Sequence, residues 1–235
     1  MAGIERGGAA KETLGVTSAS KTFSGIRVLD QASFTLEAGQ VCALIGQNGS
    51  GKSTLIEALA GAYGLNVEGG SRSARHQTRP TESPLSEALL LVRTPGRRAN
   101  AYFLRAETMH GLYTYLQDEI GDDGDFHESS HGEGFLELLD SKFRGYGFYL
   151  MDEPEAPLSF ASTLRLIARL EALRDAGAQV VVATHSPLLT ALPGATILEL
   201  GEHGIRRAKW DDLEIVAHWR RFLDRPAAYL NPLLQ

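Results

Sequence analysis

The chain reads Val41-Cys-Ala-Leu-Ile-Gly-Gln-Asn-Gly-Ser-Gly-Lys-Ser-Thr54 at the point where its fold is decided. The first five residues form a short apolar run, which is typical of a strand buried on both faces. The following eight fit the pattern G-x-x-x-x-G-K-[ST], and a helical pattern comes next. Glycines let the backbone curl so that its N–H groups face one point, and the helix start adds unpaired N–H groups and a positive dipole end. The stretch therefore predicts a cradle for the phosphates of a nucleoside triphosphate.

Within this cradle, two side chains have a defined chemical role. Lys52 should reach the β- and γ-phosphates, and the Ser53 hydroxyl should ligate Mg²⁺. A glycine-rich turn that binds nothing is the alternative, disfavoured because a strand and a helix flank the loop. The other residues predicted to hold the nucleotide are Gly46, Asn48, Gly49, Ser50, Gly51 and Thr54.

A second buried strand, over 147–151, ends in two acidic residues. A phosphate-binding loop needs a carboxylate on a neighbouring strand to hold Mg²⁺ through its water shell, and Asp152 fits that role. Glu153 can then polarise the attacking water as a general base. The alternative is a surface acid that happens to end the strand; the neighbouring Asp152 and Pro154 disfavour it.

A histidine follows the third buried strand, predicted over 179–183. His185 can hydrogen-bond the γ-phosphate and the attacking water, and so report whether the third phosphate is present. A lone histidine is more often structural, which is the alternative here. The strand end favours the functional role, because α/β proteins place their ligands at that edge of the sheet.

The rest of the chain alternates strand and helix patterns, which indicates an α/β fold: a P-loop NTPase with a mostly parallel sheet covered by helices. A small antiparallel β layer is expected over 13–36, and the insertion over 65–145 is expected to form a short helical subdomain with long loops. The remaining predicted elements are helices over 53–61, 86–92, 109–117, 163–176 and 211–223, a strand over 101–104, and a closing hairpin over 196–206.

Bulk composition is ordinary for a globular protein, and length alone leaves open one large domain or two small ones. The 235 residues are 43% hydrophobic and 22% charged, with a net charge of −6 that argues against broad nucleic-acid binding. The single cysteine, Cys42, cannot form an internal disulfide, which suits the cytoplasm. No apolar run reaches the ~20 residues that span a bilayer. One domain is expected over 13–235, after a loose leader at 1–12.

Taken together, these motifs resemble the ABC ATPases over most of the chain. The stretch Ser129-Ser-His-Gly-Glu-Gly134 is similar to the family signature L-S-G-G-Q or L-S-G-G-E, and it lies 22 residues before Asp152 when counted from its second serine. Ser129 replaces the family's leucine and a histidine replaces its first glycine. The alternative is a Ser/Gly loop that caps a helix starting at Phe135. The resemblance assigns the signature to Ser130, His131, Gly132 and Glu133.

Other positions carry over by resemblance alone. Phe23 resembles the aromatic residue that stacks on adenine. Glu107 stands near the place of a family glutamine on the metal side of the site, so a glutamate is expected to substitute there. Residues 156–159 resemble the loop that contacts the opposite subunit.

The resemblance implies a shared site and a clamp-like motion. ATP with Mg²⁺ lies between the P-loop of one cassette and the signature of another, so that ATP closes a homodimer and hydrolysis at Glu153 opens it. We expect a soluble ATPase similar to the small stand-alone bacterial ATPases described as AAA- or ABC-like, because the stretch between Lys52 and Ser130 is short for a transporter subunit.

Two alternatives stay open. One is the nucleotide-binding subunit of an ABC transporter, with a membrane protein as its partner. The other is an ATP-gated binding module with negligible turnover, which the departures in the signature favour and which Glu153 and His185 disfavour. Arginines gather between residues 72 and 105 and could contact nucleic acid. Ordinary solubilising arginines on exposed loops are the favoured explanation.

Overall fold

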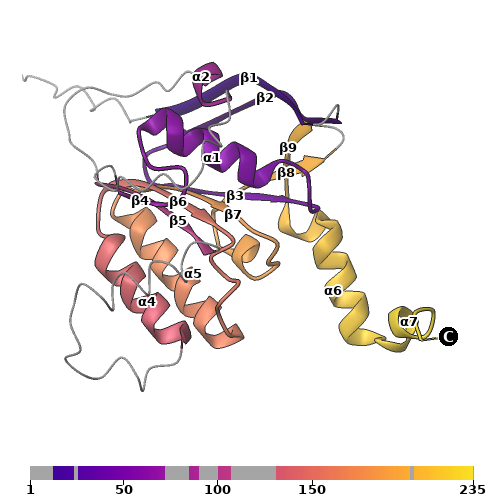
Figure 1. The fold of residues 1–235 in the computed structure, drawn as a ribbon. Helices are drawn as coiled ribbons and strands as arrows, with labels where there is room; N and C mark the ends of the chain where they lie inside the picture. Colours follow the sequence, from indigo (N-terminus) through magenta and orange to yellow (C-terminus); the bar gives the residue numbers. More distant parts are fainter. Residues whose placement is uncertain are drawn as a thin grey trace, which may run out of the picture.

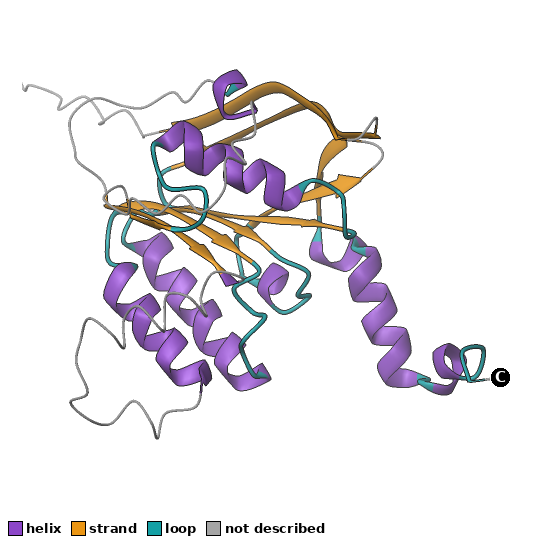
Figure 2. Cartoon of the chain, viewed as in Figure 1, coloured by secondary structure: helices purple, strands orange, loops and turns teal. Residues whose placement is uncertain are grey.

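A seven-stranded sheet with helices on both faces forms the body of the protein (Figure 1). The computed structural model describes residues 13–23, 26–71, 85–89, 100–106, 131–201 and 204–234. The strand order is β4-β5-β6-β7-β3-β8-β9, and the five strands from β5 to β8 in that order are parallel. Figure 2 shows the same arrangement by type of element. The predicted α/β class with a mostly parallel sheet is confirmed.

The strands of this sheet are β3 (Gln40–Gly46), β4 (Gly70–Ser71), β5 (Asn100–Arg105), β6 (Gly147–Asp152), β7 (Gln179–Ala183), β8 (Thr196–Gly201) and β9 (Gly204–Ala208). A separate antiparallel pair consists of β1 (Thr13–Phe23) and β2 (Ile26–Glu37), where the sequence predicts an antiparallel layer. The helices are α1 (Lys52–Tyr63), α2 (Leu85–Ala88), α4 (His131–Lys142), α5 (Phe160–Asp175), α6 (Glu214–Asp224) and α7 (Ala227–Leu230), with 3₁₀ turns at Leu189–Ala191 and Trp210–Asp212.

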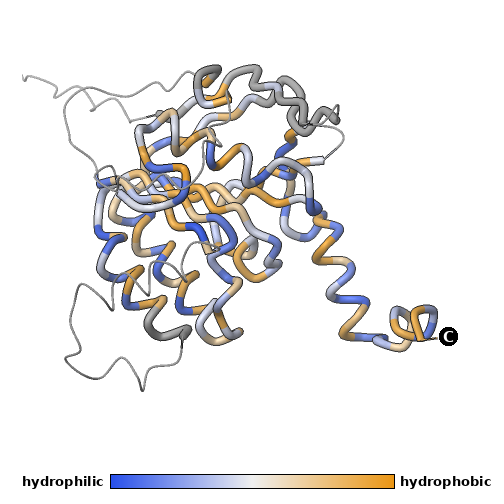
Figure 3. The backbone as a smooth tube through the Cα atoms, in the orientation of Figure 1, coloured by the Kyte–Doolittle hydropathy of each residue, from blue (hydrophilic) through white to orange (hydrophobic). Residues whose placement is uncertain are grey.

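The central strands are apolar on both sides because helices cover both faces. Every residue of β6 and β7 is buried, and apolar residues gather along the central strands in Figure 3. On one face Leu55 and Leu59 of α1 pack against the sheet, and on the other Leu166 and Leu170 of α5 do so. The strands are therefore held from both sides, and their carboxyl ends are fixed relative to each other.

Three helices start at other residues than predicted. Helix α5 begins at Phe160, not at 163, because the Ser159 hydroxyl accepts a hydrogen bond from the Ser162 N–H as an N-cap. Helix α4 begins at His131 and not at Phe135. The last long helix begins at Glu214, because a 3₁₀ turn precedes it. The leader at 1–12 and the helix expected over 109–117 lie outside the described residues.

Helix α6 projects from the body, and α7 lies beside its far end (Figure 1). Val216 packs into the core, whereas Trp219 and Leu223 are exposed. The His218 Nδ1 atom lies 2.7 Å from the Tyr229 hydroxyl, which fixes the turn between the two helices. None of the helices in the described part of the chain is long and apolar enough to cross a membrane.

Candidate active site

Three neighbouring parallel strands bring the predicted motifs to one edge of the sheet. Strand β7 lies between β6 and β3, with Asp152 beside Ala183 on one side and Leu44 beside Ala183 on the other. The loops that follow these strands contain the phosphate-binding pattern, the acidic pair and His185. Residues more than 100 positions apart thus meet at the carboxyl edge, where ligands of α/β proteins bind.

The P-loop takes a backbone path that only glycine follows without strain. Gly49 and Gly51 have φ values of 80° and 89°. At Gly46 a Cβ atom would lie 2.4 Å from the Leu200 carbonyl oxygen and 2.6 Å from the Ser50 hydroxyl, so no side chain fits there. The turn is closed by the Ser50 N–H, which donates to the Gln47 carbonyl oxygen at 3.1 Å directly before the start of α1.

Lys52 is held inside this loop. Its side chain is only 4% exposed, and its Nζ donates to the carbonyl oxygens of Gly46, at 2.8 Å, and Gln47, at 3.1 Å. Burial lowers the pKa of Lys52, and the nearby carboxylates of Glu153, Asp152 and Glu155 oppose that shift. The ammonium group is thus fixed over the cradle, where an anionic phosphate would compensate for its lost hydration.

Asp152 and Ser53 offer the oxygen ligands that Mg²⁺ prefers. The Ser53 hydroxyl donates to Asp152 Oδ1 at 3.3 Å, and Asp152 is 5% exposed. Burial raises the pKa of Asp152 to about 6, although the Arg105 guanidinium and the Ser53 hydrogen bond oppose this. A buried carboxylate that resists ionisation gains most from a divalent cation, so the pair fits the predicted metal role.

Arg105 lies beside the candidate site, although the motifs did not indicate it. It ends β5 directly beside Asp152, with its Nε 3.9 Å from Asp152 Oδ2, and its Nη1 lies 2.6 Å from Glu57 Oε1 on α1. A cation therefore already faces the predicted metal carboxylate. The feature of the sequence that could have indicated Arg105 is its position directly after the strand expected over 101–104.

Glu153 and His185 are in contact. Glu153 Oε1 lies 3.0 Å from His185 Nε2, and both side chains are partly exposed at the edge of the sheet. Among the described residues other than glycine, only Glu153 has a positive φ, at 49°. Such a left-handed backbone costs on the order of 1 kcal/mol or more, and strain of this kind is concentrated at functional sites. The geometry brings a carboxylate and an imidazole together beside the phosphate cradle.

The same chemistry and fold are found in known proteins. The family described as "ABC transporter" matches residues 29–93. The arabinose import ATP-binding protein AraG of Pseudomonas fluorescens (strain Pf0-1) is 32% identical over an alignment that covers 70% of this chain and 36% of that protein. The ribose import ATP-binding protein RbsA of Chromobacterium violaceum is 26% identical, over 88% of this chain and 47% of that protein. This chain spans less than half the length of these curated relatives.

Solved structures agree on the fold. An ATP-binding subunit of an ABC transporter superposes with a TM-score of 0.54 at 18% identity, over 85% of this chain and 91% of that one. This chain contains an ABC-type P-loop ATPase domain. The predicted resemblance to ABC ATPases is confirmed, whereas the AAA part of the expected description is wrong, because the matches are with ABC proteins.

The remaining predicted positions of the ABC domain are only partly placed. His131, Gly132 and Glu133 lie in the first turn of α4, so they belong to a helix start and not to a preceding loop. Phe23 ends β1, where its backbone pairs with Ile26. Ser130 and Glu107 lie outside the described residues. In the P-loop, Asn48 is exposed and Thr54 is half-buried.

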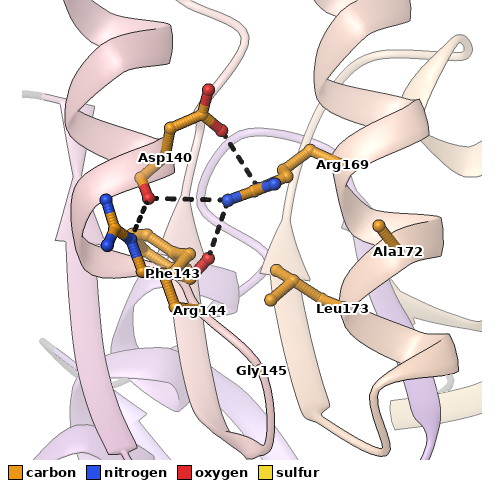
Figure 4. Close-up of a pocket in the computed structure, with 7 residues that line it drawn as sticks. All are labelled: Asp140, Phe143, Arg144, Gly145, Arg169, Ala172 and Leu173. Atoms are coloured by element: carbon orange, nitrogen blue, oxygen red, sulfur yellow. Dashed lines mark hydrogen bonds and ion pairs between the residues drawn. The ribbon is translucent and has the colours of Figure 1, made fainter.

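A hollow of the ABC domain lies between α4 and α5, and contacts among its own lining residues cross it (Figure 4). Arg169 lies 3.1 Å from the Asp140 carboxylate and donates to the carbonyl oxygens of Asp140 and Phe143, at 3.5 and 3.3 Å. The hollow adjoins the turn that leads into β6, at the opposite end of that strand from Asp152. Arg169 therefore links α4 to α5 and lies away from the candidate nucleotide site.

Proposed function

We propose that this ABC domain binds ATP with Mg²⁺ and hydrolyses it at a site completed by a second copy of the chain. The 3.0 Å contact between Glu153 and His185, beside the loop that holds Lys52, is the observation that supports hydrolysis rather than binding alone.

Each residue at this edge has a role in that reaction. Lys52 and the P-loop amides bind the phosphates, and Ser53 with Asp152 would hold Mg²⁺, which neutralises charge on the phosphate oxygens. Glu153 accepts a proton from water as the water oxygen bonds to the γ-phosphorus and the bond to the β–γ bridging oxygen breaks. His185 donates to the γ-phosphate and helps to orient the water. Glu107 and Phe23 keep the metal-side and adenine roles implied by the resemblance.

The start of α4 is the surface offered to the nucleotide of the other copy. The helix begins within the predicted signature of Ser130, His131, Gly132 and Glu133, so its unpaired N–H groups and positive dipole end lie at that motif. Such a terminus favours an anion such as the γ-phosphate. An ATP-dependent homodimer follows, because one chain supplies the cradle and the other supplies the helix start.

The test is the mass of the purified protein by light scattering with Mg²⁺ and ATP, together with phosphate release. Glu153→Gln should release no phosphate above background and should double in mass when ATP is added. Glu153→Gln combined with Lys52→Met is the matched control and should stay monomeric. A mutant that remains monomeric with bound ATP would reject the composite site, and wild-type turnover in Glu153→Gln would reject Glu153 as the base.

A second candidate is the ATP-binding subunit of a transporter located at the cytoplasmic side of a membrane. Relatives named as arabinose and ribose import ATP-binding proteins favour it. A membrane protein should then co-purify with the tagged chain from detergent-solubilised membranes. Recovery of the whole chain population in the soluble fraction, with an ATP-dependent homodimer, would favour the stand-alone ATPase.

A further inference from the structure

Glu155 lies two residues after the proposed general base, but its side chain contacts the loop of the histidine. Its Oε1 accepts a hydrogen bond from the Thr184 hydroxyl and another from the His185 backbone N–H, the latter at 3.0 Å. Thr184 is fully buried, and its oxygen also accepts from the Ser186 N–H at 2.9 Å. One carboxylate oxygen therefore fixes the backbone on which the histidine sits.

The other end of Glu155 is fixed in the turn that contains Glu153. The Ala156 N–H donates to the Glu153 carbonyl oxygen at 3.0 Å, and the Leu158 N–H donates to the Glu155 carbonyl oxygen at 2.9 Å. The Glu153 N–H in turn donates to the Ala183 carbonyl oxygen at 2.9 Å. The loop of the base and the loop of the histidine are thus joined twice, by one backbone bond and by the Glu155 side chain.

The second carboxylate oxygen of Glu155 is buried and has no hydrogen-bond partner within the described part of the chain. Leaving a carboxylate oxygen buried without a partner is costly, and stability alone would favour a neutral side chain here. Glu153 is also held in a left-handed backbone conformation in the same turn. Both costs fall on the segment that sets the distance between the base and the histidine.

We propose that Glu155 is a positioning residue that holds His185 against Glu153 by fixing the backbone of Thr184 and His185. Glu155 acts through those residues and does not touch the reacting atoms. This inference rests on the proposed hydrolysis at Glu153, and it concerns geometry that can be measured without turnover.

The first test compares Glu155→Ala with Glu155→Gln. Glu155→Ala should lower kcat by about 10- to 100-fold, because small displacements of catalytic groups have effects of that size. KM for ATP and the ATP dissociation constant should not rise, because the variant removes a negative charge near Lys52 and leaves the P-loop residues in place. Glu155→Gln should recover most of the rate, because its amide oxygen still accepts from both donors. Glu171→Ala, which removes a carboxylate from the surface of α5, is the control and should match the wild type.

The second test combines each variant with His185→Ala. If Glu155 acts through His185, Glu155→Ala should change kcat by less than about 2-fold in that background. Losses that multiply would overturn the proposal, and so would an ATP affinity that falls together with kcat. Where Glu155→Ala fails to fold, Thr184→Val removes the same hydroxyl contact with little change of shape and should lower kcat in the same direction.

A readout without catalysis separates this inference from the proposed function. In histidine-labelled protein the ring resonances of His185 should move in Glu155→Ala and stay in place in Glu171→Ala. Unmoved His185 resonances in folded Glu155→Ala reject the positioning role, whether or not the chain hydrolyses ATP. Phosphate release that does not depend on Glu153 rejects the proposed function. The His185 resonances still test the positioning role in that case, because they are measured without turnover.

Discussion

The carboxyl end of β6 and its amino end both gather polar side chains, but the contacts differ. At the carboxyl end Asp152 is buried with a raised pKa, Lys52 is buried with a lowered one, and a Glu155 oxygen is buried without a partner in the described residues. At the amino end the Tyr149 hydroxyl donates to the Arg144 carbonyl oxygen at 2.8 Å, and Arg169 contacts Asp140 and two carbonyl oxygens.

The difference distinguishes the edge that we propose binds ATP from an edge whose polar contacts are structural. Both ends also contain a glycine with no room for a Cβ atom, Gly46 in the P-loop and Gly147 at the start of β6. Tight packing therefore occurs at both ends and does not identify function. Charged groups whose burial disfavours their ionised form, and which a ligand of opposite charge would stabilise, occur at the carboxyl end.

The largest effect is expected from removing the cation at each end, which is buried Lys52 at one and partly exposed Arg169 at the other. Lys52→Met should weaken ATP binding by about 100-fold or more, because charge-assisted bonds to phosphate contribute on the order of 1.5–3 kcal/mol each. Arg169→Met should leave the ATP dissociation constant within about 2-fold of the wild type. Titration calorimetry with ATP and Mg²⁺ measures both. Equal losses in the two variants would contradict the division between the two ends.

The pH dependence of stability should depend on Asp152. The pKa of this carboxyl is about 6 in the folded protein against an ordinary value of 3.8. Between about pH 4 and pH 6 the metal-free folded protein keeps a proton that the unfolded chain has released. The free energy of unfolding should therefore fall as pH rises through this window, by up to about 3 kcal/mol.

The matched variants for this effect are Asp152→Asn and Asp140→Asn. Asp152→Asn should be more stable than wild type at pH 7 without metal and about equal to it at pH 4, as measured by urea unfolding. Asp140→Asn, at the amino end, is the matched control and should show no such gain in stability at pH 7, because its side chain is largely exposed. Parallel profiles for wild type and Asp152→Asn would show that Asp152 is ionised at no cost.

The two crowded glycines give a smaller effect. A Cβ at Gly147 would lie 2.7 Å from the Asn100 carbonyl oxygen, and one at Gly46 would lie 2.4 Å from the Leu200 carbonyl oxygen. Each change to alanine should lower the free energy of unfolding by about 1–3 kcal/mol, the range for overpacking. Only Gly46→Ala should also weaken ATP binding. A binding loss in folded Gly147→Ala of the same size would mean that the two ends are coupled.

Local sequence was enough for the parts of the site that each lie on one segment. Apolar runs predicted the three central strands, and the glycine pattern before Lys52 predicted the loop, because both signals are contained in a few consecutive residues. The contacts of Arg105 with Asp152 and of Glu155 with Thr184 were not predicted. They depend on which strands are neighbours and in what register, which the sequence of either segment does not contain.

Helix starts form an intermediate case. Ser159 is a good N-cap residue directly before the apolar stripe of α5, so the start at Phe160 could have been predicted from capping. The start of α4 could not, because glycines occupy its first turn and glycine is a poor helix former. The chain is nevertheless helical there. Phe135 and Leu139 of α4 are buried, which indicates that tertiary packing of this helix outweighs the low helix propensity of its first turn.

The smallest expected effect comes from deleting one hydroxyl at each end. Tyr149→Phe removes the bond to the Arg144 carbonyl oxygen, and Thr184→Val removes the bond to Glu155 and the one accepted from the Ser186 N–H. The free energy of unfolding should fall by about 1 kcal/mol in Tyr149→Phe and by about 2 kcal/mol in Thr184→Val, because one hydrogen bond has a net value of about 1 kcal/mol. Phosphate release should fall in Thr184→Val and stay unchanged in Tyr149→Phe. If Tyr149→Phe slowed turnover by as much as Thr184→Val, loss of stability alone would explain both results. The contacts at the carboxyl end of β6 would then have no specific role in catalysis.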